Sequence, residues 1–136
     1  MSQHPMTVLI ADDEPHIIYV TRYKLEKSGY TVLVASNGKQ AYDIACAELP
    51  DAVISDYQMP GGDGLEMAQR LRANARTAGI PIILLTARSH KVQPSALTET
   101  NVQHLMDKPF SPTDLIQKLG EMLQSASGDN PGECAA

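Results

Sequence analysis

A chain of 136 residues, with 43% apolar and 20% charged side chains, has the size and composition of one globular domain. The formal net charge of −5 argues against direct nucleic-acid binding, and no apolar run is long enough for membrane insertion. The chain lacks a secretory signal and a CxxC pair, which argues against a disulfide framework or a zinc site, so we expect a cytoplasmic protein.

Short apolar runs alternate with segments of helical periodicity along the chain. The runs are typical of strands buried on both faces, as in a parallel sheet. They lie at residues 8–11, 32–35, 52–55 and 82–85, with a weaker fifth at 104–106. Apolar residues recur at helical spacing over 17–25, 41–49, 65–71 and 115–123. This alternation predicts an α/β fold: a flavodoxin-like, doubly wound, five-stranded parallel sheet in the order 2-1-3-4-5, with helices on both faces.

Turn and capping residues support these boundaries. Gly29 follows the first helical pattern as a stop, and Asn37 opens the second. Ser111 followed by Pro112 predicts the start of the last helix. Pro94 falls where a fourth helix is expected, so it must either begin that helix or shorten it.

The domain is expected to extend over residues 6–124. Residues 125–136 are small, polar and interrupted by Gly and Pro, so we expect them to be a flexible terminus, as are residues 1–5. No repeat or linker indicates a second domain.

Carboxylates follow two strands that are expected to be neighbours. Asp12 and Asp13 come directly after the first strand, and Asp56 follows the third. In this fold, ligands bind beyond the carboxyl ends of the strands, so the three carboxylates should share one pocket. Their mutual repulsion calls for a cation, and oxygen ligands without His or Cys favour Mg²⁺.

Two further polar residues follow the fourth and fifth strands. Thr86 offers a hydroxyl donor and Lys108 a compact positive charge, which are the groups that a phosphoryl oxygen requires. A carboxylate beside Mg²⁺ can act as a nucleophile, and Asp56 is the best candidate because it lies centrally. The pattern predicts an aspartyl-phosphate formed on the protein itself.

Four motifs occur in order at the predicted strand ends: LIADDEP at 9–15, SDYQMPGGDG at 55–64, LLTAR at 84–88 and DKPF at 107–110. Together they resemble a response-regulator receiver domain of two-component signalling, in its stand-alone form of the chemotaxis or phosphorelay type. The resemblance implies a phosphoacceptor switch that catalyses only its own phosphorylation and dephosphorylation.

At the matching positions, the resemblance implies that Asp56 accepts a phosphoryl group from a histidine kinase or a histidine phosphotransfer protein. It implies that Asp13 and Asp56 bind Mg²⁺ directly, that Asp12 binds it through water, and that the backbone carbonyl of Gln58 is a further ligand.

The resemblance assigns roles around the phosphoryl group as well. Thr86 and the backbone N–H of Ala87 would hold phosphoryl oxygens, and Lys108 would pair with the phosphate. Gln58 and Arg88 occupy positions that modulate phosphoryl lifetime in this family.

One position departs from the family pattern. The family usually has Tyr or Phe three residues before the lysine, as a switch that moves inward with the threonine, whereas this chain has Leu105. His104 is adjacent, but neighbouring strand residues point to opposite faces, so it is no simple replacement. The resemblance implies that a separate protein target binds the face formed by the expected fourth helix, the fifth strand and the last helix.

Two other classes of function are open alternatives. Leu105 suggests a receiver-like docking module that phosphate does not regulate. An aspartate-based phosphatase, or a flavin or nucleotide site, is possible on the same fold, although the first loop is acidic and no GxGxxG motif occurs. An alternative role for Asp12 is that of a helix cap only, but a cap needs one carboxylate and leaves Asp13 unexplained.

Overall fold

The computed structural model describes residues 6–57, 64–86, 100, 102–107 and 111–128. Within them, strands and helices alternate as expected from the sequence. The elements are β1 (Thr7–Ala11), α1 (Pro15–Lys27), β2 (Thr31–Ala35), α2 (Gly38–Glu48), β3 (Ala52–Asp56), α3 (Gly64–Ala73), β4 (Ile82–Thr86), β5 (Val102–Asp107) and α5 (Pro112–Gly128).

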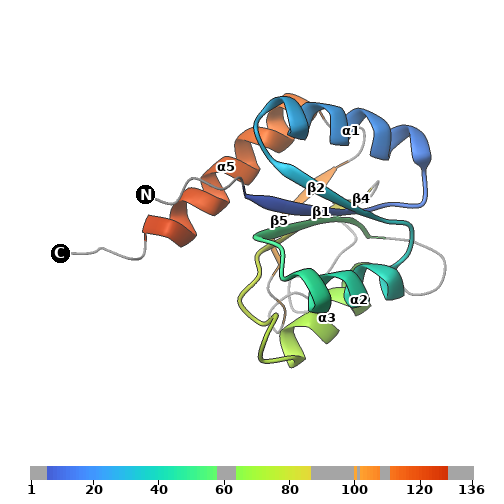
Figure 1. Ribbon diagram of the computed structural model, residues 1–136, viewed down its shortest axis with the longest axis vertical. Coiled ribbons are helices and arrows are strands. Elements are labelled where there is room, and N and C mark those ends of the chain that lie inside the picture. The colour runs from blue at the N-terminus through green and yellow to red at the C-terminus, as the bar shows by residue number, and fades with distance from the viewer. Residues whose placement is uncertain (1–5, 58–63, 87–99, 101, 108–110, 129–136) are drawn as a thin grey trace.

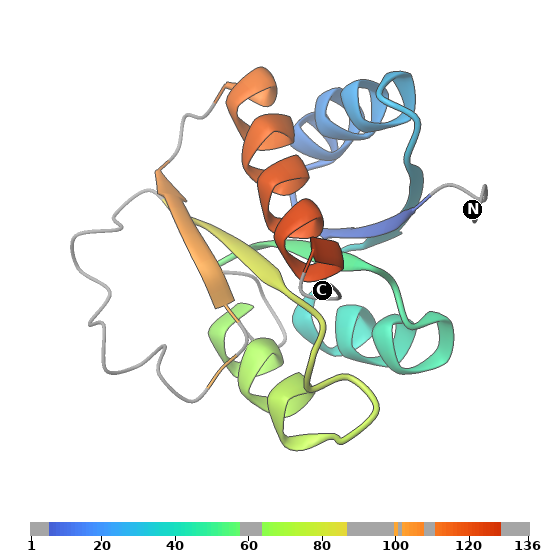
Figure 2. The same ribbon diagram turned by 90° about the vertical axis from the view of Figure 1, so that its left-hand side faces the viewer.

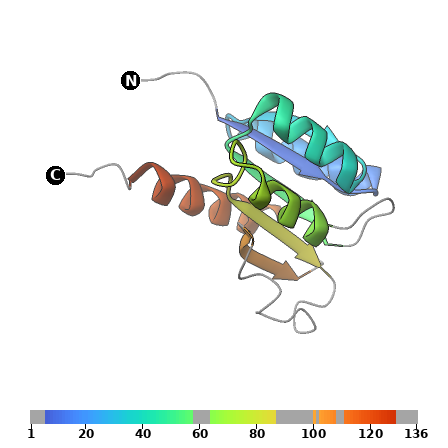
Figure 3. The same ribbon diagram turned by 90° about the horizontal axis from the view of Figure 1, so that it is seen from below.

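All five strands join one parallel sheet in the order β2-β1-β3-β4-β5, which confirms the predicted fold class. Helices α1 and α5 cover one face of the sheet, and α2 and α3 cover the other (Figure 1). Strand β5 lies at one edge beside β4, as Figure 2 shows, and Figure 3 shows α2 and α3 side by side on their face. None of the described helices is long and apolar enough to cross a membrane.

Strand residues alternate between two cores, one on each face of the sheet. In β1, Leu9 packs with the residues of α2 and α3, whereas Val8 and Ile10 pack with those of α1 and α5. The first core is rich in alanine, and the second has larger side chains. The helical members of the first core include Ala41, Ala45, Met67, Ala68 and Leu71, and those of the second include Leu25, Leu115, Leu119, Met122 and Leu123.

The helix boundaries follow the predicted caps. The Asn37 side chain accepts a hydrogen bond from the Gln40 N–H at 2.8 Å, and the Ser111 hydroxyl accepts one from the Asp114 N–H at 3.4 Å. Gly29 has a φ of 98°, a conformation that favours glycine after a helix.

Two helix ends differ from the sequence expectation. Helix α2 ends at Glu48 because Pro50 cannot continue it, and Leu49 adopts a left-handed φ of 49°. Helix α5 continues to Gly128, so residues 125–128, expected to belong to the flexible terminus, extend the helix instead. Serine and alanine there tolerate helical geometry, and the helix ends at a glycine. The segment around Pro94 lies outside the described residues.

Candidate functional site

The three predicted carboxylates meet at the carboxyl edge of the sheet. Strands β1 and β3 are neighbours in register, with Ala11 opposite Ser55, so the residue after each of these lies at the same level. One carboxylate oxygen from each of Asp12, Asp13 and Asp56 lies within 4.8 Å of the other two. The fold therefore brings Asp56 together with two adjacent carboxylates that lie far from it in the sequence.

The burial of these carboxylates differs. Asp12 is 1% exposed and Asp56 is 8% exposed, whereas Asp13 is exposed to solvent. Removing charged groups from water is costly unless partners or a cation compensate for it. The cluster is open on the Asp13 side, so an ion can reach it from solvent.

Local backbone contacts fix Asp12. Its N–H donates to the Ala35 carbonyl at 3.1 Å, and its Oδ1 accepts from the Glu14 N–H at 2.9 Å. Glu14 is the residue before α1, and its side chain makes no capping hydrogen bond of its own. The capping alternative is thus true in part, because one oxygen of Asp12 supports the start of α1, but this contact does not involve Asp13 or Asp56.

The donor set fits a hard cation. All three side chains supply oxygen, and carboxylate oxygens are the ligands that Mg²⁺ prefers in proteins. Three like charges at this separation repel one another, and a divalent cation would offset that repulsion. Asp12, Asp13 and Asp56 are the described residues able to hold such an ion.

Thr86 ends β4 on the same edge of the sheet and is 6% exposed. In the sheet Asp56 on β3 pairs with Leu85 on β4. Thr86 is therefore one residue further along β4 than the partner of Asp56, the candidate phosphoacceptor. Strand β5 ends at Asp107, directly before Lys108. The other predicted site residues, Gln58, Ala87, Arg88 and Lys108, lie outside the described residues, and their roles stay predictions.

Leu105, at the position where the family usually has an aromatic residue, lies within the described part of β5. Leu105 pairs with Leu84 and packs, partly buried, against the core on the α2 and α3 face. Met106 packs against the opposite core, so the alternation places His104 on the Met106 side of the sheet. His104 therefore does not occupy the place of the usual aromatic, as the sequence predicted.

Sequence reasoning missed one residue beside the site. Ser55 is completely buried, and its hydroxyl donates to the Asp56 carbonyl at 2.9 Å, a contact that neither the apolar strand pattern nor the motif at 55–64 predicts. A serine within an otherwise apolar strand was the signal available in the sequence.

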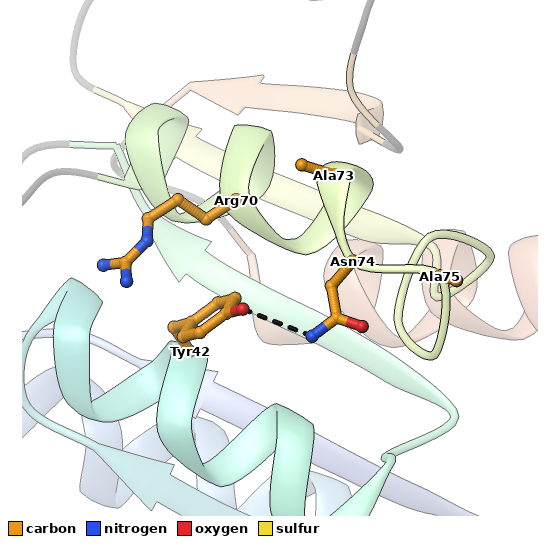
Figure 4. A pocket seen from close by; sticks show the side chains of 5 residues that line it. All are labelled: Tyr42, Arg70, Ala73, Asn74 and Ala75. Atoms are coloured by element: carbon orange, nitrogen blue, oxygen red, sulfur yellow. Dashed lines mark hydrogen bonds between the residues drawn. The ribbon is translucent and has the colours of Figure 1, made fainter.

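A second concave feature lies away from the carboxylates. A groove of about 500 Å³ between α2 and α3 is lined by Tyr42, Arg70, Ala73, Asn74 and Ala75 (Figure 4). It lies near the C-terminal end of α3, whereas the acidic cluster lies beside the first residue of that helix. None of the predicted site residues lines this groove.

Comparison with known proteins agrees with the arrangement at the sheet edge. The family model of the response regulator receiver domain matches residues 8–120. The chain is 35% identical over 130 residues to the phosphate regulon transcriptional regulatory protein PhoB of Pseudomonas aeruginosa, covering 96% of this chain and 56% of PhoB. It is 36% identical over 134 residues to response regulator Rre1 of Synechocystis, covering 96% and 58%. The chain thus spans little more than half of the length of these relatives.

Solved structures share the fold. A putative response regulator from Chloroflexus aurantiacus superposes with a TM-score of 0.81 and 32% identity, covering 88% of this chain and 98% of that one. The receiver domain of the sensor histidine kinase PA1611 of Pseudomonas aeruginosa, whose crystal structure has a magnesium ion coordinated in the active site cleft, gives 0.80 and 26%, with the same coverage. On the extent of the family match, the chain belongs to the response regulator receiver domain family of two-component signalling.

Proposed function

We propose that this receiver domain takes a phosphoryl group on Asp56 in a Mg²⁺-dependent reaction and thereby changes its affinity for a separate partner. The observation that carries the proposal is the cluster of Asp12, Asp13 and Asp56 at the carboxyl edge of the sheet. Crowded carboxylates of like charge repel one another, and a bound divalent cation would offset that repulsion.

In the proposed reaction, a carboxylate oxygen of Asp56 attacks the phosphorus of a phosphohistidine on a histidine kinase or a phosphotransfer protein. The new O–P bond forms as the P–N bond breaks, and the imidazole nitrogen keeps the electron pair of that bond. Bound Mg²⁺ would supply charge neutralisation at the phosphoryl oxygens. Asp12 and Asp13 would hold the ion, and Asp56 would both contact it and act as the nucleophile.

Residues at the ends of β4 and β5 complete the proposed site. The Thr86 hydroxyl and the Ala87 N–H would donate to phosphoryl oxygens, and Lys108 would neutralise the added charge. Gln58 and Arg88 are proposed to set how long the phosphoryl group persists, and the backbone carbonyl of Gln58 is proposed as a further Mg²⁺ ligand. On this proposal, the only reactions that the domain promotes are its own phosphorylation and dephosphorylation.

The proposed output is a change in a binding face that includes β5 and α5. Leu105 pairs with Leu84 on β4, two residues before Thr86, and we propose that a movement of Thr86 would be passed to Leu105 through the β4 backbone. In this proposed coupling, the aliphatic side chain of Leu105 stands where the family usually has Tyr or Phe. A cytoplasmic location fits the proposed kinase partner, and neither nucleic-acid binding nor membrane insertion is part of the proposal.

The test is phosphorylation by a small donor. With Mg²⁺ and acetyl phosphate, intact-protein mass spectrometry should show one added acid-labile phosphoryl group, and peptide mapping should place it on Asp56. The Asp56→Asn variant should gain none. Asp51→Asn is the matched control, because Asp51 directly precedes the other end of β3, where it accepts a hydrogen bond from the Thr7 N–H at 2.7 Å. That variant should be modified as the natural chain is.

The alternatives give different results in the same assay. An unmodified natural chain would support a docking module without phosphate regulation. Sustained release of inorganic phosphate from an added phosphomonoester, without covalent modification, would support an aspartate-based phosphatase.

A further inference from the structure

Ser55 lies directly before the proposed phosphoacceptor and faces away from the acidic cluster. Its neighbour Val53 packs into the core on the α2 and α3 face, and the strand alternation places Ser55 on that face as well. The side chain is completely buried, and its hydroxyl donates a hydrogen bond to the Asp56 carbonyl oxygen at 2.9 Å. The hydroxyl therefore contacts the backbone of the residue whose side chain is proposed to react.

Gly64, the first residue of α3, approaches the same carbonyl from the helix. A Cβ atom placed on Gly64 would overlap the Asp56 carbonyl oxygen, and it would lie 2.9 Å from the Ser55 hydroxyl and 3.1 Å from a methyl carbon of Leu84. Only a residue without a side chain fits this contact. Helix α3 is thus packed directly on the backbone that carries the phosphoacceptor.

Two further hydrogen bonds fix the next residue. The Tyr57 N–H donates to the Leu85 carbonyl at 2.7 Å, and the Gly64 N–H donates to the Tyr57 carbonyl at 2.8 Å. The backbone of Asp56 and Tyr57 is therefore held from the side of β4 and from the side of α3. These contacts lie at the point where the chain leaves β3 for the segment 58–63.

We propose that Ser55 is a positioning residue for phosphoryl transfer: its buried hydroxyl, packed under Gly64, orients the backbone of Asp56 and so aims the carboxylate at the incoming phosphorus. This inference rests on the proposed function of Asp56. It assigns a role in the reaction to a side chain that contacts the backbone carbonyl of Asp56 rather than its carboxylate.

The expected effect follows from geometry. The attack requires the carboxylate oxygen, the phosphorus and the leaving atom to be aligned, and small misplacements of a reacting group cost large factors in rate. Removing one neutral hydrogen bond that holds this alignment should slow phosphorylation by about fivefold, the factor that corresponds to one typical hydrogen bond.

The experiment compares Ser55→Ala with Thr77→Val. Thr77 is also completely buried and also donates its hydroxyl to a backbone carbonyl, that of Leu71, at 2.6 Å, but at the far end of α3. Both variants remove a buried hydroxyl-to-carbonyl hydrogen bond beside the same helix, and both should lower the midpoint of urea unfolding. Only Ser55→Ala should slow phosphorylation by acetyl phosphate at saturating Mg²⁺.

A spectroscopic readout separates positioning from general loss of stability. The carbonyl ¹³C resonance of Asp56 should shift in Ser55→Ala and keep its position in Thr77→Val, because loss of a hydrogen bond changes the shielding of the carbonyl carbon. Ser55→Cys keeps a side chain of similar shape with a weaker hydrogen-bond donor, so it should also slow phosphorylation. This variant replaces Ser55→Ala in the experiment if Ser55→Ala does not fold.

The outcomes distinguish the two proposals. If the natural chain is phosphorylated on Asp56 and Ser55→Ala reacts at the same rate, the positioning role is wrong while the proposed function stands. Equal slowing by Thr77→Val would also overturn the positioning role, since stability would then explain both variants. If the natural chain gains no phosphoryl group, both proposals fail.

Discussion

The acidic edge of the sheet and the α2–α3 groove both gather polar side chains from distant parts of the chain, but their chemistry is opposite. At the acidic edge, Asp12, Asp13 and Asp56 present oxygens of like charge within 4.8 Å of one another. In the groove, hydrogen-bond donors contact acceptors, and a cation lies over an aromatic ring. The first arrangement opposes folding, and the second supports it.

The groove contacts centre on Asn74, which follows the last residue of α3. Its side-chain N–H₂ donates to the Tyr42 hydroxyl at 3.2 Å and to the Cys46 sulfur at 3.5 Å, and its oxygen accepts from the Arg76 N–H at 3.0 Å. The Arg70 guanidinium lies 4.4 Å from the centre of the Tyr42 ring (Figure 4). These complementary contacts join α2 to α3, so they are explained by packing alone. At the acidic edge, by contrast, three carboxylates of like charge lie together, and on the proposed function a divalent cation would offset their repulsion.

The largest expected effect that tests this difference is that of Mg²⁺ on stability. An ion that binds only the folded chain should raise the free energy of unfolding by about 2.7 kcal/mol at a concentration 100 times its Kd. Urea unfolding with and without Mg²⁺ measures this change. Asp13→Asn should lose most of the Mg²⁺ effect, and Asn74→Ala should retain all of it. An equal stabilisation by Mg²⁺ of the natural chain, Asp13→Asn and Asn74→Ala would show that the ion does not bind the acidic edge.

Neutralising one carboxylate should stabilise the metal-free chain. In the absence of Mg²⁺, Asp56→Asn should raise the free energy of unfolding by about 1 to 2 kcal/mol, because repulsion from two neighbouring carboxylates is removed. Chelator-treated protein and urea unfolding provide the measurement. Asp51→Asn, which removes a charge outside the cluster, should change the stability by less than about 0.5 kcal/mol. A loss of stability in Asp56→Asn would contradict the proposed repulsion.

The sheet could be predicted well because strands buried on both faces have a nearly continuous apolar sequence. The edge strand β5 was the weakest prediction, and the structure shows the reason. Four of its residues are only partly buried and two are exposed, so its sequence includes Gln103 and His104 and lacks a continuous apolar run. Helix α5 extended further than expected because nothing in residues 125–127 opposes helical geometry.

The acidic edge could be predicted as well, since residues that follow neighbouring parallel strands meet at one edge. The contact of Ser55 with the Asp56 carbonyl could not be predicted from the sequence, because it depends on how closely α3 packs on β3. The contact between Tyr42 and Asn74 joins residues 32 positions apart, and no periodic pattern connects a helix residue to a turn. Likewise, no sequence pattern indicates that the Cys46 sulfur accepts a hydrogen bond from the same side chain.

The smallest expected effect tests the groove itself. Asn74→Ala should lower the free energy of unfolding by about 1 kcal/mol, because the Tyr42 hydroxyl loses its partner in a partly buried place and the exposed Arg76 N–H loses its acceptor. Urea unfolding measures the loss, and Gln69→Ala, on the exposed side of α3, is the control that should leave the stability within about 0.5 kcal/mol. The rate of phosphorylation by acetyl phosphate should be the same in both variants as in the natural chain, since the groove lies at the end of α3 opposite Gly64. A slower reaction in Asn74→Ala alone would mean that the groove is coupled to the acidic edge through α3, and the two regions would then not be independent.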